Sequence, residues 1–202
     1  MKSQDLDWVD HSINPSENKH LTPEYLRMNP NGVVPTLVHD SSPIIDSSVI
    51  VEYLDEVFPE PKLTPPDPLG RARMRAWLRY LEEKPTPAVR YPTFNRILLK
   101  NYRDLSADEF KNEAQIRPLK TVFYRKMGQE GFNEEDINEA VRDIKQTLMR
   151  MEKALSEGGP WLLGDVYSLA DICVAPLIDL SLIHISEPTR PRLISYAVFC
   201  LK

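Results

Sequence analysis

The sequence predicts an α+β protein in which a small domain with a short sheet comes first and an all-helical domain follows. Three observations support this prediction. Two short segments rich in β-branched residues lie at 33–40 and 43–46, a proline-rich connector (FPEPKLTPPDP) occupies 58–68, and apolar residues at helical spacing dominate the remainder. Strands followed by a run of helices are typical of α+β architectures.

The first block is predicted to run strand, helix, strand, strand, helix. Residues 6–13 (LDWVDHSI) are predicted as a strand. Thr22 is predicted to cap a short helix with Pro23 at its first position, and the turn cluster Asn-Pro-Asn-Gly at 29–32 ends it. After the two β-branched segments, a helix is predicted from Asp46. Its apolar face consists of Val49, Ile50, Tyr53, Leu54 and Val57.

Pro35 interrupts an apolar run that otherwise has the pattern of a strand. Proline cannot donate a hydrogen bond to a neighbouring strand, so it is normally confined to edges, first strand positions or bulges. The backbone around Pro35 is therefore predicted to serve something other than sheet pairing.

Two connected stretches carry a resemblance to a known family. HLTPEYLRMNPNGVVPTL, followed by DSSVIVEYLDEVFPEP, resembles the glutathione-binding half of the thioredoxin-like domain of cytosolic glutathione S-transferases, of the theta/delta-like or bacterial type. The combination of N-P-x-G-x-V-P-x-L with a later acidic residue, serine and helix is specific. The resemblance implies the glutathione transferase fold, here an incomplete thioredoxin-like N-terminal domain followed by an all-α C-terminal domain. It also implies glutathione as co-substrate and a homodimer.

The resemblance accounts for Pro35. It implies a cis peptide bond before this proline, which turns the N–H and C=O of Val34 toward the cysteinyl part of glutathione. A cis bond before proline costs only about 0.5–1 kcal/mol, so a binding site tolerates one. The alternative is a trans proline on an edge strand.

The positions of Asp46 and Ser47 suggest a binding role independently of the resemblance. They stand at the N-terminus of the predicted helix, where free N–H groups and the helix dipole favour an anion. The resemblance implies that Ser47 holds the γ-glutamyl carboxylate and that Asp46 attracts the ammonium group of the ligand. The alternative is simple N-capping by the same two residues.

His20, within ENKHLTPEYL, is the last binding candidate. The resemblance implies that this region reaches the glycine carboxylate of glutathione, and the alternative is a solvated surface histidine. The chain departs from the family pattern at Val33, where many relatives carry Lys or His for that carboxylate.

No residue is assigned as the catalytic, thiolate-activating group. In the family, a Ser, Tyr or Cys at the junction of the first strand and helix has this role, and here only MKSQD precedes residue 6. We therefore expect this strand and helix to be missing and the chain as written to be an inactive fragment. Neither Ser3 nor Tyr25 is put forward as a substitute.

The predicted domains are a partial thioredoxin-like glutathione-binding domain at 1–60, a linker at 61–68 and an incomplete all-helical domain at 69–179. Residues 180–202 (LSLIHISEPTRPRLISYAVFCLK) are predicted to be an artefact, because Leu180 to Arg190 and Ile194 to Leu201 resemble a translated sequencing adapter. The alternative is a genuine tail of unusual composition.

The helical domain shows three clear signals. Asp67 is predicted to cap its first helix, which KPTPAVRYP at 84–92 must kink or stop. Ser168 and Asp171 form a capping box whose predicted role is folding rather than chemistry. A stripe at 134–157 is predicted to face the core. It consists of Ile137, Val141, Ile144, Leu148, Met151 and Leu155.

Composition argues against several other functions. A net charge of −5 does not fit a general nucleic-acid binder, and no apolar stretch approaches the roughly 20 residues of a membrane span. Two cysteines, Cys173 and Cys200, fit a reducing, cytoplasmic location. No zinc-ligand spacing or phosphate-binding glycine loop is present, so no metal site is predicted.

The leading interpretation is an enzyme that binds glutathione and transfers its thiolate to a small, apolar electrophile. The reaction could be conjugation, ether cleavage, isomerisation or reduction. Tyr91 and Phe94 are predicted as core residues, with a place in an apolar substrate pocket as the alternative. The alternative function is a non-catalytic member of the family that acts as a dimerisation or protein-binding module.

Overall fold

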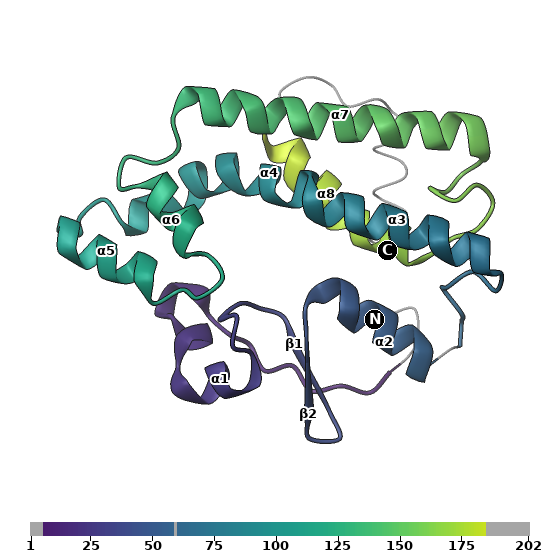
Figure 1. Cartoon of the computed structure of the whole chain (residues 1–202), viewed down its shortest axis with the longest axis horizontal. Helices are drawn as coiled ribbons and strands as arrows, with labels where there is room; N and C mark the ends of the chain where they lie inside the picture. The colour runs from purple at the N-terminus through teal and green to yellow at the C-terminus, as the bar shows by residue number, and fades with distance from the viewer. Residues whose placement is uncertain (1–5, 59, 185–202) are drawn as a thin grey trace. The chain divides into compact units, whose positions relative to one another are not determined.

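The computed structural model describes residues 6–58 and 60–184 of the chain (Figure 1). The chain divides into two compact units. The N-terminal unit comprises Met1–Pro61 with Leu98–Gly131, and the helical unit comprises Lys62–Ile97 with Phe132–Lys202. Residues 98–131, which the sequence analysis placed in the helical domain, thus group with the N-terminal unit; the domain boundaries given there stay a prediction.

The N-terminal unit begins without the predicted strand at 6–13. These residues have no regular structure, and the side chains of Trp8 and Val9 are 61% and 78% exposed. The prediction is wrong because a strand needs a neighbour to bond with, and the sheet of the described residues contains only the strands β1 and β2.

Helix α1 (Pro23–Met28) follows two 3₁₀ turns, Pro15–Glu17 and Lys19–Leu21. Thr22 Oγ1 accepts the N–H of Tyr25 at 3.3 Å, and Pro23 occupies the first helical position, as predicted. The helix ends at Asn29, whose N–H donates to the carbonyl of Tyr25. The start and the end of this helix are therefore confirmed.

A short hairpin forms the sheet. Strand β1 (Thr36–His39) pairs antiparallel with β2 (Ser42–Ile45), in a register that sets Thr36 opposite Ile45 and His39 opposite Ser42. The two turn residues, Asp40 and Ser41, both have positive φ (48° and 65°). Such a turn matches the twist of a two-residue hairpin. The predicted pair of strands is confirmed.

Helix α2 (Ser47–Val57) follows β2 directly and has Asp46 as its N-cap. Its buried face includes Ile50 and Leu54, whereas Val49 and Val57, predicted on the same apolar face, are 48% and 41% exposed. The helix therefore starts where the sequence predicts, and its first turn lies next to the end of β2 that pairs with the start of β1.

The second part of the N-terminal unit contains the 3₁₀ turn Leu99–Asn101, helix α5 (Ala107–Gln115) and helix α6 (Thr121–Met127). Ser106 and Glu109 form a capping box at the start of α5. Arg117, which is buried, lies between α5 and α6 and donates to Asn18 Oδ1 at 2.8 Å and to Glu113 Oε2 at 2.9 Å. This arginine links the segment before α1 to α5 and α6.

The helical unit contains α3 (Pro68–Glu83), α4 (Pro85–Thr93), α7 (Glu134–Gly158) and α8 (Leu169–His184), with a π turn at Phe94–Leu98 (Figure 1). Helix α4 packs against α3, α7 and α8. Asp67 caps α3 through the N–H of Gly70 at 2.8 Å, and α3 stops before the predicted proline segment.

The core of the helical unit confirms the predicted stripe on α7. Ile144, Met151 and Leu155 are buried, and the remaining stripe residues are half-buried. Phe94 is buried, and the ring of Tyr91 lies 4.2 Å from that of Phe132 between centroids. Both aromatic residues therefore belong to the packed interior of this unit, as the first interpretation held.

The capping residue of α8 is fully buried. Asp171 Oδ2 accepts the N–H and the hydroxyl of Ser168 at 2.8 and 3.0 Å, and its Oδ1 accepts the N–H of Leu162 at 2.9 Å. Asp171 therefore caps the start of α8 as predicted, and its role in folding stays a prediction. The helix continues from Leu180 to His184, and the rest of the predicted artefact, 185–202, lies outside the described residues.

Candidate functional site

The Val34–Pro35 peptide bond is cis, as predicted, and the trans alternative is excluded. The side chain of Val34 is 47% exposed, and Thr36 begins β1 immediately after the proline. Among the described residues, none donates to the C=O of Val34 or accepts from its N–H. The loop before β1 therefore presents one unused donor and one unused acceptor at an exposed position.

The hairpin register brings this loop close to the start of α2. Because Thr36 pairs with Ile45, the next residues outward along the two strands are Pro35 and Asp46, followed by Val34 and Ser47. Paired strands lie about 5 Å apart. The register therefore places Val34 and Pro35 at the same end of the hairpin as Asp46 and Ser47, where β1 begins and β2 ends.

Asp46 takes an unusual backbone conformation, with φ at 75°. Its Oδ1 accepts the N–H of Ser48 at 3.0 Å, the hydroxyl of Ser48 at 2.8 Å and the N–H of Val49 at 3.3 Å. The N-capping alternative is thus realised by Asp46. All three of these bonds go to one oxygen, so Oδ2 faces no bonding partner among the described residues. Non-glycine residues with positive φ concentrate at functional sites.

Ser47 is the first residue of α2 and is exposed. It makes no capping bond, since Asp46 fills that role. The first N–H groups of a helix have no intrahelical acceptor, and the helix dipole places partial positive charge there. Ser47 therefore offers a hydroxyl and a backbone N–H where a carboxylate is favoured.

His20 lies in the 3₁₀ turn Lys19–Leu21 and is half-buried. Its Nδ1 is buried without a hydrogen-bond partner among the described residues. Burial lowers the pKa of His20, and the positive charges of Arg117 and Lys120 lower it further. His20 is thus partly shielded from solvent, and its place in a binding site stays a prediction. No hydrogen bond among the described residues joins His20 to the Val34 loop or to Asp46.

The sequence analysis did not anticipate a cluster of polar side chains behind the loop. The hydroxyl of Tyr25 and the amide of Asn29 both donate to the carbonyl of Val33, and both contact Thr36 Oγ1. The sequence placed Asn29 in a turn, and nothing in the pattern of residues showed where its amide points.

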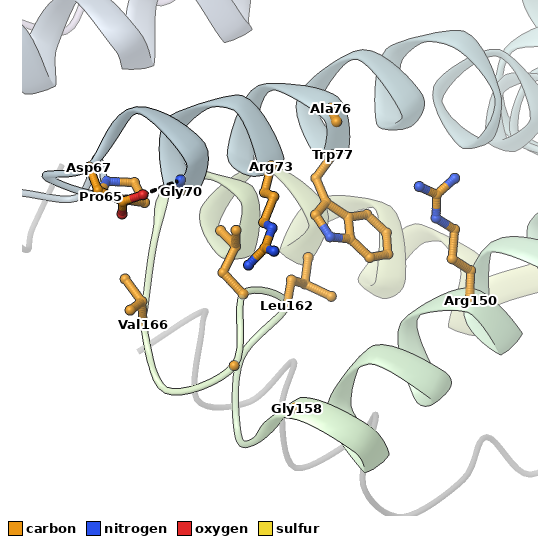
Figure 2. Close-up of a pocket in the computed structure, with 12 residues that line it drawn as sticks. Pro65, Asp67, Gly70, Arg73, Ala76, Trp77, Arg150, Gly158, Leu162 and Val166 are labelled. Atoms are coloured by element: carbon orange, nitrogen blue, oxygen red, sulfur yellow. Dashed lines mark hydrogen bonds between the residues drawn. The ribbon is translucent and has the colours of Figure 1, made fainter.

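A separate cavity of about 570 Å³ lies within the helical unit (Figure 2). Trp77 and Arg73 on α3 line it together with Arg150 on α7 and Leu162 and Val166 of the following loop. The guanidinium of Arg150 lies 4.7 Å from the centre of the Trp77 ring. None of the predicted binding residues lines this cavity.

In the described part of the chain, no three His, Cys, Asp or Glu side chains are grouped so that they could hold a metal ion. Over the same residues, no helix has the length and apolar character needed to cross a bilayer.

Two family models match the chain. The model for the glutathione S-transferase N-terminal domain matches residues 1–62, and the model for the glutathione S-transferase C-terminal domain matches residues 118–191. The matched N-terminal range contains all of the predicted binding residues.

Two curated relatives align along most of the chain. It is 33% identical over 178 residues to Glutathione S-transferase 1 of Dianthus caryophyllus, covering 88% of this chain and 67% of the relative. It is 31% identical over 166 residues to Protein LigF of Sphingobium sp. (strain NBRC 103272 / SYK-6), covering 80% of this chain and 64% of LigF. The chain thus spans 64% and 67% of the lengths of these two relatives.

Solved structures show the same fold. The structure of Beta-etherase LigF from Sphingobium sp. strain SYK-6 has a TM-score of 0.85 at 27% identity, covering 98% of this chain and 85% of that one. A glutathione transferase homologue from Sulfitobacter, solved with bound glutathione, has a TM-score of 0.69 at 18% identity, covering 98% and 82%. At that identity the second likeness supports the fold alone.

Proposed function

The chain belongs to the glutathione S-transferase family, and from that premise we propose that it binds glutathione at the end of the β1–β2 hairpin. The observation that carries the proposal is the unused N–H and C=O of Val34, beside a helix N-terminus that begins with Asp46 and Ser47. One peptide ligand with a carboxylate and an ammonium group can use all of these groups.

Each end of glutathione then has a partner of suitable chemistry. The cysteinyl backbone pairs with the N–H and C=O of Val34 in the manner of an added strand. The γ-glutamyl carboxylate binds the hydroxyl and N–H of Ser47, and its ammonium group binds the free oxygen of Asp46. The glycine carboxylate lies toward His20, where Arg117 and Lys120 already supply positive charge.

The proposed reaction is attack of the glutathione thiolate on a small, apolar electrophile. The likeness to the β-etherase LigF favours ether cleavage among the possible subtypes. In that reaction a carbon–sulfur bond forms as the carbon–oxygen bond breaks, and the electron pair leaves with the ether oxygen. Binding in a common site supplies proximity, and a larger thiolate fraction supplies nucleophile.

We assign the thiolate-activating role to no described residue. The hydroxyl of Tyr25 is buried and bonded to the carbonyl of Val33, so it does not face a ligand thiol. Ser3 lies outside the described residues. A homodimeric state and a cytoplasmic location remain predictions from the family resemblance.

Calorimetric titration of the chain with reduced glutathione tests the proposal, with free cysteine as the control ligand. Cysteine has the thiol but lacks the peptide carbonyl and the glycine carboxylate. We expect saturable heat from glutathione and none from cysteine. No saturable heat from glutathione, or equal heats from both ligands, would contradict the proposal.

A further inference from the structure

The carbonyl of Val33 accepts two hydrogen bonds from side chains on α1 and the turn after it. The hydroxyl of Tyr25 donates at 2.8 Å, and Nδ2 of Asn29 donates at 2.7 Å. Tyr25 is 5% exposed and Asn29 is 0% exposed. A single backbone oxygen is therefore held by two buried donors that cannot easily move.

The two donors are themselves fixed. The one hydroxyl proton of Tyr25 goes to Val33, so its contact of 2.8 Å with Thr36 Oγ1 is donated by Thr36. The second amide proton of Asn29 goes to Thr36 Oγ1 at 3.1 Å, and Oδ1 of Asn29 accepts the N–H of Asn31 at 3.1 Å. Every side-chain donor of the cluster therefore makes a hydrogen bond, and the donor and the acceptor of each bond are determined.

Because the peptide unit is planar, a fixed carbonyl of Val33 also fixes the orientation of the N–H of Val34. The C=O of Val33 and the N–H of Val34 belong to one peptide unit, and the cis bonds of the described chain lie elsewhere, before Pro35 and Pro61. In a trans peptide these two groups point in opposite directions within a plane. A carbonyl that is held toward buried Tyr25 and Asn29 therefore turns the N–H of Val34 away from them, at an exposed residue.

We propose that Tyr25 and Asn29 are positioning residues, which aim the N–H of Val34 at a carbonyl of the bound ligand by holding the carbonyl of Val33. This inference rests on the proposed glutathione site and names the part of the protein that orders it. A donor already oriented in the free protein loses less conformational freedom on binding than a mobile one. Neither side chain touches the ligand, so their effect passes through Val34.

The test compares Tyr25→Phe with Tyr80→Phe. Tyr80 also makes a hydroxyl contact with a threonine, Thr147 at 3.0 Å, but in the helical unit. The probes are glutathione and an analogue in which the cysteinyl carbonyl is reduced to a methylene group. This analogue has no acceptor for the N–H of Val34, so it reports binding without the positioned contact.

We expect Tyr25→Phe to weaken glutathione binding about three- to tenfold, the usual range for one hydrogen bond, with the analogue changed less than about twofold. Tyr80→Phe should leave both affinities as in the wild type. An equal loss of affinity for both ligands would show that the effect does not pass through the N–H of Val34. No loss of affinity would show that binding does not need the hydrogen bond from Tyr25 to the carbonyl of Val33. Either result overturns the inference and leaves the proposed function standing.

A ligand-free readout separates the inference from the proposed function. In the ¹⁵N–¹H spectrum, Tyr25→Phe should shift the Val34 amide more than Tyr80→Phe does, even if the wild type bound no glutathione. An unchanged Val34 amide would overturn the inference whatever the binding result. If Tyr25→Phe does not fold, Asn29→Ala replaces it, because it removes the other side-chain donor to the carbonyl of Val33.

Discussion

Thr36 lies opposite Ile45 in the hairpin, and this pairing places Val34 and Pro35 at the same end of the hairpin as Asp46 and Ser47. The two pairs come from separate stretches of sequence, one before β1 and one after β2. A slip of one residue in the register would move every side chain to the other face. The turn at Asp40 and Ser41 therefore determines the geometry of the proposed site as much as the binding residues do.

The double change Asp46→Ala with Ser47→Ala should weaken glutathione binding at least about tenfold, since each residue offers a charge-assisted contact. Calorimetric titration measures this effect. Asp67→Ala is the matched control, because Asp67 caps α3 through Gly70 but lies in the helical unit. It should lower the free energy of unfolding through the loss of the cap and leave the affinity unchanged. Unchanged affinity in the double variant would remove both residues from the site.

Asp171→Ala should lower the free energy of unfolding by about 2–4 kcal/mol, more than Asp67→Ala. It removes the acceptor for the N–H groups of Leu162 and Ser168, both of which are buried, and leaves these donors without that partner. Urea denaturation followed by circular dichroism measures the difference. Losses of equal size in the two variants would show that burial adds nothing to this cap.

Stability should depend on pH through His20, whose pKa is below its usual 6.5 in the folded chain because of burial, Arg117 and Lys120. As the pH falls below about 6.5, the unfolded chain binds a proton at His20 that the folded chain does not. The free energy of unfolding therefore falls with pH until the lower, folded pKa is passed. We expect His20→Gln to lose less stability than the wild type between about pH 7.5 and about pH 5.5.

Urea denaturation of both proteins at the two pH values provides the measurement. The acidic residues are the same in both proteins, so their contribution to the change in the free energy of unfolding cancels in the comparison. Equal losses would contradict a lowered pKa at His20. A histidine that interacts chiefly with a carboxylate would give the opposite order, with the wild type losing less.

Local patterns in the sequence predicted much of the fold. Thr22 and Pro23 mark the start of α1, the α7 stripe follows helical spacing, and Ser168 with Asp171 marks the start of α8. Each of these signals depends on residues within one or two turns. The strand at 6–13 was mispredicted because strand formation depends on a partner elsewhere in the chain.

Other features depend on contacts that no local pattern contains. The grouping of 98–131 with the N-terminal unit includes the bond from Arg117 to Asn18, 99 residues away. The roles of Tyr25 and Asn29 depend on where a hydroxyl and an amide point, which residue spacing does not show. Val34, Asp46 and Ser47 were found through the family motif, and the register then explained why they belong together.

The proposed site assigns the binding of glutathione to Val34, Asp46 and Ser47. Titration of the ¹⁵N-labelled chain with reduced glutathione, followed in ¹⁵N–¹H spectra, reports on this site residue by residue, because each of the three residues has a backbone N–H. We expect these three amides to show the largest saturable shifts. Saturable shifts centred instead on the cavity between Arg73, Trp77 and Arg150, with these amides unmoved, would contradict it.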